Sequence, residues 1–599
     1  MDAQSGSDSN TGTQSAPYKT IQAAINAANT QNQKGNAVSV EIAAGIYRES
    51  VSIAGSKTTS ATLTVESTAP GGAIIAGSDV LTGWTVESAS VYSHAWTYSL
   101  GSCSIPSGWP SNFAPIAQRR EMVFVNGVPL TQVMVRADLQ PGTFFVDDAA
   151  GRMYISPSAG TNIATATVEG AVRSKTLSVS GRTNVTLRGL VFRHAANCLN
   201  TGSATVSGGS NILVDSIQAL WNNWGGFSLA STNGATVQNS IASYNGGVGF
   251  NADHNQNAVF NSNESDYNNW RGAQAAFYDW AMGGTKLFAN HTVTVQNHFA
   301  YNNQAQGLWF DTDNKDVTAS NATLVGNKQA ALQIERNEGP ITLQNSHLCS
   351  SGVGVISLTS ENVTLQNNVF YNNSGTGNYQ AQLFIGGQAG GINITDFQTG
   401  QVYDLFTTGM VVTGNSFVDA SSGQLLFGTY LSGTDWSQFT STLKAGNNQW
   451  FDPANSNAFK IANGKLVNLS GWQGAVGTDL TSVWQSPSAS PVAACTAPVP
   501  SYADFAVNVD NTTYTMTSGT AVAKARVVSF GSGTVTLQPA DLPAGVSASL
   551  STQSLTSGVA TLTLTASASA ATQTVPITLF ATSGPRVHSV TFYVKVSAQ

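Results

Sequence analysis

Two acidic segments of this 599-residue chain carry the side chains best suited to chemistry, and they lie 24 residues apart. The first contains Asp311 within Trp-Phe-Asp-Thr-Asp, and the second contains Glu335 within Gln-Ile-Glu-Arg-Asn-Glu. If one structural repeat has about this length, the two carboxylates lie on neighbouring strands, which are about 4.7–4.9 Å apart. Carboxyl groups separated by about 5–5.5 Å suit the retaining cleavage of a glycosidic bond, in which one attacks and the other donates a proton.

Further acids are predicted to lie on the same strip, because they follow a recurring turn Asn at a constant distance. The intervals are 8, 9 and 8 residues for Asn245 to Asp253, Asn302 to Asp311 and Asn327 to Glu335. Asp279 belongs to an extra segment, 277–284, that falls between the first two acids. Since two close carboxyl groups cannot ionise equally easily, such a cluster separates the pKa values of its members.

Polar and aromatic side chains near these acids are predicted to hold a sugar. Trp is suited to this role because it offers a large flat apolar face with a polar edge. The predicted substrate-binding residues are Asp253, His254, Trp270, Tyr278, Asp279, Trp280, Trp309, Asp313, Arg336 and Glu338. Simpler explanations exist for each residue alone, since turn acids are often solvated, Trp often packs in a core, and His254 can be an ordinary turn histidine.

The element that must position these residues is a repeat of strands and turns between about 176 and 420. Segments such as NVTLRGLVF from 184, TVTVQNHFA from 292 and NVTLQNNVF from 362 combine inward apolar residues with a bend where Asn can adopt the αL conformation. The equivalent turn residues, which give a repeat of about 22–25 residues, are Asn222, Asn245, Asn268, Asn302, Asn327 and Asn372. Stacked coils of this kind predict a right-handed parallel β-helix with a ladder of Asn side chains.

The whole chain is predicted to be all-β. Residues 1–79 are expected to hold the first coils and a cap helix, because Ile21, Ala24, Ile25 and Ala28 have helical spacing. Residues 80–172 are interpreted as an inserted β subdomain and 173–485 as the catalytic β-helix. Residues 486–501 have the composition of a Pro/Ser/Ala linker, and the alternating strands of 502–599 indicate an Ig-like β-sandwich.

The composition narrows the choice of partner. Charged residues make up 10% of the chain and the net charge is −7, which argues against nucleic acid or a membrane surface and favours a carbohydrate. Four widely separated cysteines leave open one or two long-range disulfides. We expect a monomer and, from the Gly- and Asn-rich β pattern, a mature secreted protein that is extracellular or periplasmic.

Several motifs resemble the β-helix glycoside hydrolases that include β-xylosidases and α-L-fucosidases. They are the opening SGSDSNTGTQSAPYKTIQAAI, the segment IIAGSDVLTGW and, above all, GLWFDTDNKDV followed by IERNEGP. In the xylosidase branch, Trp followed by Leu, Ile or Phe and then Asp supplies the nucleophile, and E-x-x-x-G-P supplies the acid/base, which implies Asp311 and Glu335 here. Family members often have a Trp where this chain has Thr312, and Glu338 is an extra acid. The resemblance therefore does not transfer a substrate, and Glu338 is a second candidate proton donor.

The sequence thus predicts a secreted retaining glycoside hydrolase that acts on a plant or bacterial polysaccharide or oligosaccharide without a cofactor. One alternative is a polysaccharide lyase with a calcium ion on Asp311, Asp313 and Asp316. In that case Lys315, Lys328 or Arg336 would neutralise the substrate's charge. Another alternative is a non-catalytic glycan-binding β-helix, in which substitution of the acids would be tolerated.

Overall fold

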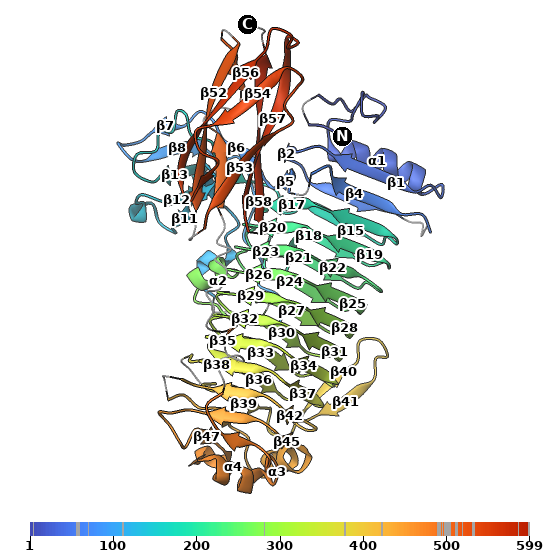
Figure 1. Cartoon of the computed structure of the whole chain (residues 1–599), viewed down its shortest axis with the longest axis vertical. Helices are drawn as coiled ribbons and strands as arrows, with labels where there is room; N and C mark the ends of the chain where they lie inside the picture. Colours follow the sequence, from blue (N-terminus) through green and yellow to red (C-terminus); the bar gives the residue numbers. More distant parts are fainter. Residues whose placement is uncertain are drawn as a thin grey trace.

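The structure is a computed structural model. It describes residues 1–599 except 4, 56–59, 70, 111–112, 281, 376–378, 421–422, 488–492, 494, 496–504, 510–512, 518, 530–532, 585 and 597–599. Figure 1 shows a long stack of coils with an additional β unit at its N-terminal end and short helices at its far end. Among the described residues, none of the helices is long and apolar enough to cross a membrane.

Three parallel sheets run the length of the stack in the described part of the chain, and each coil contributes one strand to each sheet in turn. Sheet 1 contains β1 (Val38–Ile42), β4 (Leu63–Ser67), β16 (Val185–Arg188), β19 (Ile212–Asp215), β22 (Thr236–Gln238), β25 (Gln256–Asn261), β28 (His291–Gln296), β31 (Lys315–Ser320), β34 (Ile341–Gln344), β37 (Val363–Gln366), β42 (Val411–Thr413) and β45 (Lys444–Gly446). Sheet 2 contains β2 (Gly45–Tyr47), β5 (Ala73–Ala76), β17 (Leu190–Arg193), β20 (Gln218–Leu220), β23 (Ile241–Ser243), β26 (Glu264–Asp266), β29 (Phe299–Tyr301), β32 (Thr323–Val325), β35 (His347–Cys349), β38 (Val369–Tyr371), β43 (Ser416–Val418), β46 (Gln449–Phe451) and β49 (Val483–Trp484).

Sheet 3 carries the candidate site. It contains β3 (Val51–Ala54), β15 (Leu177–Ser180), β18 (Gly202–Ser207), β21 (Gly225–Ala230), β24 (Val248–Asp253), β27 (Gly283–Phe288), β30 (Leu308–Asp311), β33 (Ala330–Glu335), β36 (Val353–Leu358), β39 (Leu383–Gly386), β44 (Phe427–Thr429), β47 (Phe459–Lys460) and β48 (Leu466–Val467). These three sheets confirm the predicted parallel β-helix.

Alternating side chains explain why the coils stack. In β28 the buried Val293 and Val295 alternate with more exposed Thr294 and Gln296, so one face of the strand points into the stack. The inward residues of all three sheets form one continuous apolar core along the axis. Each fully buried Val, Leu, Ile or Phe side chain contributes about 1.5–3 kcal/mol relative to exposure, so the core stabilises the stack as a unit.

Asn ladders fix the corners between the sheets, but the ladder residues differ in part from those predicted. At the corner between sheets 2 and 3 the side chains of Asn268, Asn303 and Asn327 bond in series, with Nδ2···Oδ1 distances of 3.0 and 2.9 Å. The sequence assigned Asn302 and Asn372 to the ladder, but each lies one residue before the actual ladder residue, Asn303 or Asn373. Asn302 and Asn372 instead adopt the left-handed conformation, with φ of 50° and 49°. Because the ladder Asn must point inward, the preceding residue makes the bend.

Helices close both ends of the stack. At the N-terminal end, α1 (Ile21–Asn32) begins at Thr20, whose side chain accepts a hydrogen bond from the N–H of Ala23, and Ile21 and Ile25 are buried against the first coils. The helix lies in the segment for which the sequence predicted a cap helix. At the opposite end, α3 (Gly433–Thr442) and α4 (Leu469–Val476) cover the last coils with Phe439 and Trp472. A short 3-10 turn, η3 (Ala462–Gly464), lies between α3 and α4 in the sequence.

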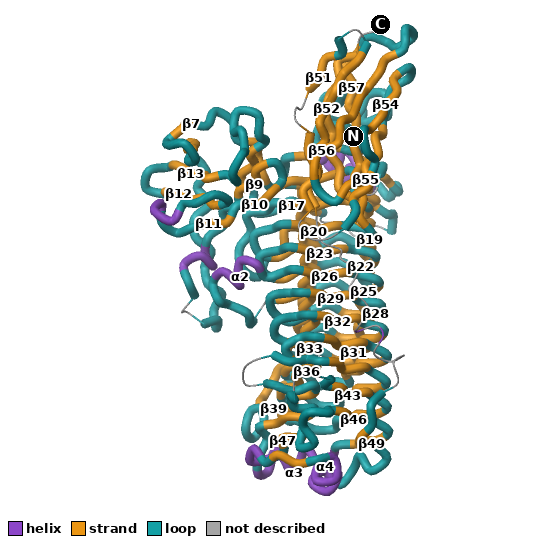
Figure 2. The backbone as a smooth tube through the Cα atoms, turned by 60° about the vertical axis from the view of Figure 1, so that its left-hand side comes forward, coloured by secondary structure: helices purple, strands orange, loops and turns teal. Residues whose placement is uncertain are grey.

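A β subdomain projects from one side of the stack near the N-terminal end (Figure 2). One of its sheets consists of β6 (Ser78–Val80), β9 (Val123–Val125), β10 (Val128–Pro129) and β14 (Val168–Ala171). The other consists of β7 (Thr85–Val86), β8 (Tyr92–Ala95), β11 (Thr131–Gln132), β12 (Thr143–Asp147) and β13 (Arg152–Ser156). The turns η1 (Pro115–Gln118) and η2 (Arg136–Asp138) belong to the same segment, whose core includes Trp96, Phe144 and Ile155.

Buried polar contacts and a disulfide attach this subdomain to the coils. Arg271, on the short helix α2 (Trp270–Gln274), is fully buried and donates to Asn223 Oδ1, Gln132 Oε1 and the carbonyl of Glu121 at 2.8–3.0 Å. A disulfide joins Cys103 of the subdomain to Cys198 of the β-helix.

The rest of the chain forms a hairpin and a terminal β-sandwich. The hairpin pairs β40 (Ile392–Thr395) with β41 (Val402–Leu405). The sandwich packs a sheet of β50 (Phe505–Val509), β52 (Thr520–Ser529), β54 (Val546–Leu550) and β56 (Gly558–Ala566) on one of β51 (Thr513–Thr515), β53 (Val535–Ala540), β55 (Ser554–Leu555), β57 (Gln573–Ser583) and β58 (Arg586–Val596). It stands at the N-terminal end of the stack, where β58 lies against β2 (Figure 1). Most of the predicted linker, 486–501, lies outside the described residues; Cys495 within it forms a disulfide with Cys349.

Candidate active site

Sheet 3 presents two parallel rows of outward side chains over five successive coils. Within each row, adjacent strands are paired residue by residue, so the side chains stack directly above one another. The row at the end of each strand is Asp253, Phe288, Asp311, Glu335 and Leu358. The row two residues earlier is Asn251, Lys286, Trp309, Gln333 and Ile356. Because side chains two residues apart share one face of a strand, both rows line one pocket.

Asp311 and Glu335 are direct neighbours in this arrangement. They are register partners on β30 and β33, so their backbones have the separation of adjacent strands, about 4.7–4.9 Å. Lys286 Nζ lies 2.7 Å from Asp311 Oδ2, and Asp311 Oδ1 accepts a hydrogen bond of 2.9 Å from the hydroxyl of Thr312. The Lys286 side chain is nearly buried and lies 4.1 Å from the centroid of the Trp309 ring. A cation and a hydroxyl therefore orient both oxygens of Asp311.

Glu335 has a different environment. Burial and, secondarily, the nearby charge of Asp311 raise the pKa of the Glu335 carboxyl above its usual value. Gln333 Nε2 donates to Glu335 Oε2 at 2.8 Å, and Gln306 Nε2 donates to Gln333 Oε1 at 2.8 Å. The pocket thus holds one ion-paired carboxylate next to one carboxyl that retains its proton to higher pH.

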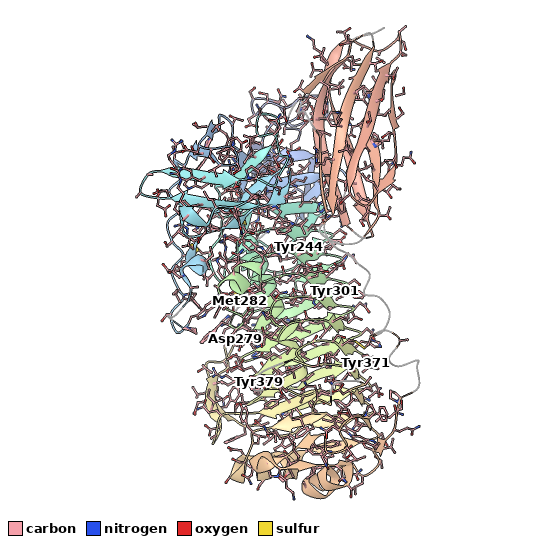
Figure 3. The ribbon with its side chains drawn as sticks, turned by 90° about the vertical axis from the view of Figure 1, so that its left-hand side faces the viewer. Tyr244, Asp279, Met282, Tyr301, Tyr371 and Tyr379 are labelled. Atoms are coloured by element: carbon pink, nitrogen blue, oxygen red, sulfur yellow. A yellow bond between two sulfur atoms is a disulfide. The ribbon has the colours of Figure 1, made fainter. Side chains whose placement is uncertain are left out.

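The walls of the pocket come from loops outside the coils. Its volume is about 550 Å³, and Trp109 of the inserted subdomain lines it together with Asp279 and Trp280 from the segment that follows α2. The Trp109 and Trp280 rings are 5.8 Å apart between centroids. Figure 3 shows Asp279 and Tyr379 on the same side of the stack, below the subdomain. The result is an open-sided pocket with aromatic walls and an acidic floor.

Two buried polar atoms in the lining residues have no hydrogen-bond partner among the described residues. They are Trp309 Nε1 and Gln306 Oε1. An unpaired buried donor or acceptor costs about 1–3 kcal/mol.

Comparisons with known proteins agree on the fold of the central coils. The family model described as "Right handed beta helix region" matches residues 273–370, and the model "Protein of unknown function (DUF1565)" matches residues 4–53. The search of curated proteins found no match. The stack is therefore a right-handed β-helix, as predicted.

Similar solved structures include two epimerase modules and a phage protein. The A-module of the Azotobacter vinelandii mannuronan C-5 epimerase AlgE4 is 15% identical, with a TM-score of 0.41, over 78% of this chain and 95% of that chain. The AlgE6 A-module from the same organism is 14% identical, with a TM-score of 0.38, over 74% of this chain and 86% of that chain. The tailspike protein gp49 of Acinetobacter baumannii bacteriophage Fri1, a capsular polysaccharide depolymerase, is 9% identical, with a TM-score of 0.26, over 90% of this chain and 81% of that chain. At these identities the likeness concerns the fold alone, and the finer resemblance to β-xylosidases and α-L-fucosidases stays a hypothesis.

Seven of the twelve predicted site residues line the pocket. Besides Asp311 and Glu335, those that line it are Asp253, Asp279, Trp280, Trp309 and Arg336. Asp279 is buried enough that its pKa is raised. Arg336 Nε lies 3.9 Å from Glu335 Oε1, and its side chain is half-exposed.

The other predicted residues lie elsewhere, which corrects the sequence interpretation. His254 does not line the pocket; its Nδ1 is bonded to Asp253, and its ring contacts Phe397. Trp270 donates its indole N–H to the carbonyl of Tyr244 at 2.8 Å and packs under the subdomain. Tyr278, which was also predicted to bind substrate, does not line the pocket, and Lys328 Nζ lies 3.8 Å from the centroid of its ring.

Two predicted acids also lie outside the pocket. Glu338 forms an ion pair of 2.8 Å with Lys315, so it is not placed to act as the proton donor. Asp313 is buried on the other side of the turn, where its carboxylate accepts hydrogen bonds from the N–H of Phe397 and the hydroxyl of Tyr403. The predicted calcium set is not formed, because Asp311, Asp313 and the exposed Asp316 face three different surroundings.

Sequence reasoning missed Lys286, Trp109, Gln333 and Tyr379, all of which line the pocket. Gln333 could have been found by moving two residues back from the outward Glu335, since that position shares its face. The count fails at Lys286 because the α2 segment lengthens that coil. Trp109 and Tyr379 come from loops, for which the repeat gives no position.

Proposed function

We propose that this protein is a retaining glycoside hydrolase that acts on a neutral or weakly charged polysaccharide or oligosaccharide. The observation that carries the proposal is the pairing of Asp311 with Glu335 on adjacent in-register strands at the floor of one pocket. Carboxyl groups at about the spacing of neighbouring strands suit a covalent two-step mechanism better than an inverting one, which needs more room for a water molecule.

The two environments support one assignment of the roles. In the first step Glu335 donates its proton to the glycosidic oxygen while Asp311 attacks the anomeric carbon, so the leaving group departs as an alcohol and a glycosyl ester forms. In the second step Glu335 takes a proton from water, the resulting hydroxide attacks the anomeric carbon, and Asp311 leaves as a carboxylate. The raised pKa of Glu335 suits the proton donor. The ion pair with Lys286 keeps Asp311 oriented between these steps.

The remainder of the pocket supports a carbohydrate ligand. Trp109 and Trp280 offer ring faces on which a sugar can stack. Acids outnumber cations among the lining residues, which disfavours a strongly anionic substrate. The two disulfides support an oxidising location such as the periplasm or the extracellular space.

The test is mass spectrometry of products from a panel of plant and bacterial glycans, in ordinary and heavy-oxygen water. We expect products heavier by one water per cleaved bond, with the label at the new reducing end. Glu335→Gln should lower turnover by about 10²–10⁴-fold, and Asp311→Asn by about 10⁴-fold or more. A slow fluorinated glycoside should leave a covalent adduct on the peptide that contains Asp311.

Matched controls are available in the same two segments. Asp316→Asn removes an exposed acid five residues after Asp311, and Glu338→Gln removes the second acid of the Glu335 segment. Both should retain turnover. Full activity of Asp311→Asn or Glu335→Gln would refute the proposal, and loss of activity in Glu338→Gln alone would move the proton donor to Glu338.

A polysaccharide lyase is the second candidate, and the buried Lys286 is the observation that favours it. A cation inside the pocket could neutralise a uronate carboxylate while a neighbouring group removes the adjacent proton. Lys286 is already paired with Asp311, however, which leaves the half-exposed Arg336 for this role. Unsaturated products without incorporation of heavy oxygen would establish the lyase instead.

A further inference from the structure

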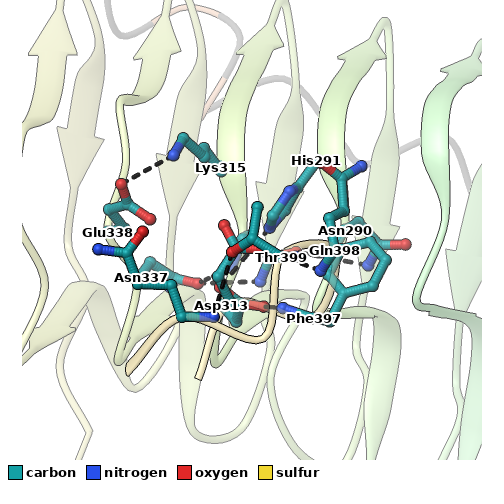
Figure 4. Close-up of polar contacts among 12 residues, drawn as sticks. Asn290, His291, Asp313, Lys315, Asn337, Glu338, Phe397, Gln398 and Thr399 are labelled. Carbon is teal, nitrogen blue, oxygen red and sulfur yellow. Dashed lines mark hydrogen bonds and ion pairs between the residues drawn. The ribbon is translucent and has the colours of Figure 1, made fainter. Parts of the chain in front are cut away.

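A second polar cluster lies on the other side of the turn that follows Asp311, and the proposed hydrolysis does not use it. It consists of His291 at the start of β28, Asp313 in the turn after β30, and Asp396 in the loop of the β40–β41 hairpin. We propose that these three side chains form a binding site for one divalent transition-metal ion, for which Zn²⁺ is the best match. Figure 4 shows the hairpin loop with Phe397, Gln398 and Thr399 over Asp313 and His291.

The geometry of the three residues fits such an ion. One potential ligand atom from each residue lies within 4.8 Å of the other two, and all three residues are buried. His291 Nε2 lies 3.5 Å from Asp313 Oδ1. Two ligand atoms with bonds of about 2.0–2.1 Å to a tetrahedral zinc ion are about 3.4 Å apart. His291 Nε2 and Asp313 Oδ1 therefore already have the spacing of two ligands on one zinc ion.

His291 supplies an independent indication. The residue is 4% exposed, and its Nε2 atom has no hydrogen-bond partner among the described residues. The simpler explanation is an ion pair between a protonated His291 and the two carboxylates. That explanation predicts an N–H···O bond of about 2.7–3.2 Å, whereas the 3.5 Å contact does not have the geometry of a hydrogen bond. A metal ion between the atoms accounts for both the burial and the missing bond.

Surrounding groups hold the carboxylates in place. Asp313 Oδ2 accepts a hydrogen bond of 2.8 Å from the N–H of Phe397, and Asp313 Oδ1 accepts one of 3.2 Å from the hydroxyl of Tyr403. Asp396 Oδ1 accepts from the N–H groups of Gln398 and Thr399 at 2.9 and 2.8 Å. Such outer contacts are usual around metal ligands, because they fix ligand orientation before the ion binds.

The donor atoms select the kind of ion. One imidazole nitrogen with two carboxylate oxygens matches zinc sites, which combine His with Asp or Glu. Calcium and magnesium prefer oxygen ligands alone, so a buried imidazole argues against them. Two carboxylates balance the charge of a divalent ion.

The site would fasten the hairpin to the coils. Asp396 comes from the hairpin loop, whereas His291 and Asp313 come from consecutive coils of the β-helix. Since Asp313 follows Asp311 by two residues, the ion would also brace the turn beside the pocket. Metal binding here is separate from the proposed hydrolysis and is tested without measuring activity.

The experiment uses the full-length protein, treated with a chelator, desalted and titrated with ZnCl₂. We expect one zinc per chain by mass spectrometric metal analysis and a melting temperature that rises with zinc concentration. Substitution by Co²⁺ should give the intense visible absorption of a tetrahedral or five-coordinate centre. His291→Gln and Asp396→Asn should each weaken zinc binding by about 10–100-fold or more.

Asp404→Asn is the matched control, because it removes an exposed acid from the same hairpin and should leave zinc binding unchanged. Circular dichroism of each variant without metal checks that it folds, and the Co²⁺ spectrum of the unsubstituted protein needs no variant. Absence of stoichiometric zinc, zinc binding that survives both His291→Gln and Asp396→Asn, or binding of Ca²⁺ in preference to Zn²⁺ would each overturn the proposal.

Discussion

Asp311 and Glu335 carry the same functional group on neighbouring strands, but Lys286 forms an ion pair with Asp311 while Glu335 is largely buried. Burial disfavours a charge, whereas a nearby cation favours it. The pair thus consists of Asp311, which is ion-paired with Lys286, and Glu335, whose carboxyl has a raised pKa. This division depends on single neighbouring residues and can be altered one residue at a time.

The pH dependence of turnover should report the protonation of Glu335. Because the donor must be protonated, kcat/KM should fall as the pH rises through the raised pKa of Glu335. Arg336 is a positive charge that lowers this pKa, so Arg336→Met should move the alkaline limb to higher pH. The measurement is a kcat/KM profile against pH for both proteins.

Arg188→Met is a suitable control for this profile, since Arg188 forms ion pairs with Glu66 and Asp215 on the outer face of sheet 1, away from the pocket. The control should leave the alkaline limb in place. A limb that moves to lower pH in Arg336→Met would contradict the role given to Glu335.

The pairing of Asp311 with Glu335 could be predicted from the sequence, because both acids follow a repeated turn and the repeat length fixes their alignment. Lys286 could not, since the α2 segment lies between its coil and the preceding one and hides the register. Asp313 and His254 were wrongly assigned to the pocket because residues beyond the strand end pass around the corner. Their side chains then face the β40–β41 hairpin, which the repeat does not predict.

At the scale of the elements, the corners decide where the pocket residues stand. Once Asn303 replaces Asn302 in the ladder, the interval from ladder residue to outward acid is eight residues for Asn245 to Asp253, Asn303 to Asp311 and Asn327 to Glu335. Equal intervals place equivalent residues in one row. The sequence suggested the ladder but not its exact member in Asn-Asn pairs, because either Asn can make the bend.

Asn303→Ala should destabilise the coils and disturb the pocket. Asn303 Oδ1 accepts hydrogen bonds from both nitrogens of Asn268 at 3.0 Å, and its Nδ2 donates to the carbonyl of Ser265 and to Asn327 Oδ1. Each buried group left without a partner costs about 1–3 kcal/mol. We expect a lower midpoint in thermal denaturation followed by circular dichroism.

Asn303→Ser is the matched comparison. The chain itself has Ser351 at an equivalent position, where its hydroxyl accepts from the N–H of Asn327 at 3.1 Å. Ser should therefore preserve part of the ladder and lose less stability than Ala. Equal stability of Asn303→Ala and the unsubstituted protein would show that the ladder does not hold this corner.

At the scale of the whole molecule, the pocket depends on parts that are distant in sequence. The coils supply the floor, whereas Trp109 of the inserted subdomain packs against Phe277 and Trp280 to form a wall. The fully buried Arg271 holds the two parts together, and burial lowers its pKa to about 9. Periodicity predicted the β-helix and the sandwich. The docking of the subdomain and the disulfide pairing could not be predicted, because four cysteines allow three pairings and loops carry no period.

The Cys103–Cys198 disulfide should matter for substrate binding more than for the chemical step. It closes a loop with a sequence separation of 95 residues and lies in the same apolar cluster as Trp109 and Phe277. In the chain-entropy model a loop of this size contributes about 4–5 kcal/mol. In the double variant Cys103→Ser with Cys198→Ser, the wall loosens while Asp311 and Glu335 stay on the β-helix. We therefore expect KM to rise several-fold with a smaller change in kcat, and faster proteolysis within 80–172.

The second disulfide provides the matched control for this prediction. Cys349–Cys495 joins β35 to the segment before the sandwich, and neither cysteine lines the pocket. The double variant Cys349→Ser with Cys495→Ser removes a crosslink of the same kind, so it should lower the melting temperature while KM stays unchanged. If the two double variants change KM equally, the wall does not depend on its covalent attachment. If kcat falls instead of KM rising, the subdomain acts on the orientation of Asp311 and Glu335.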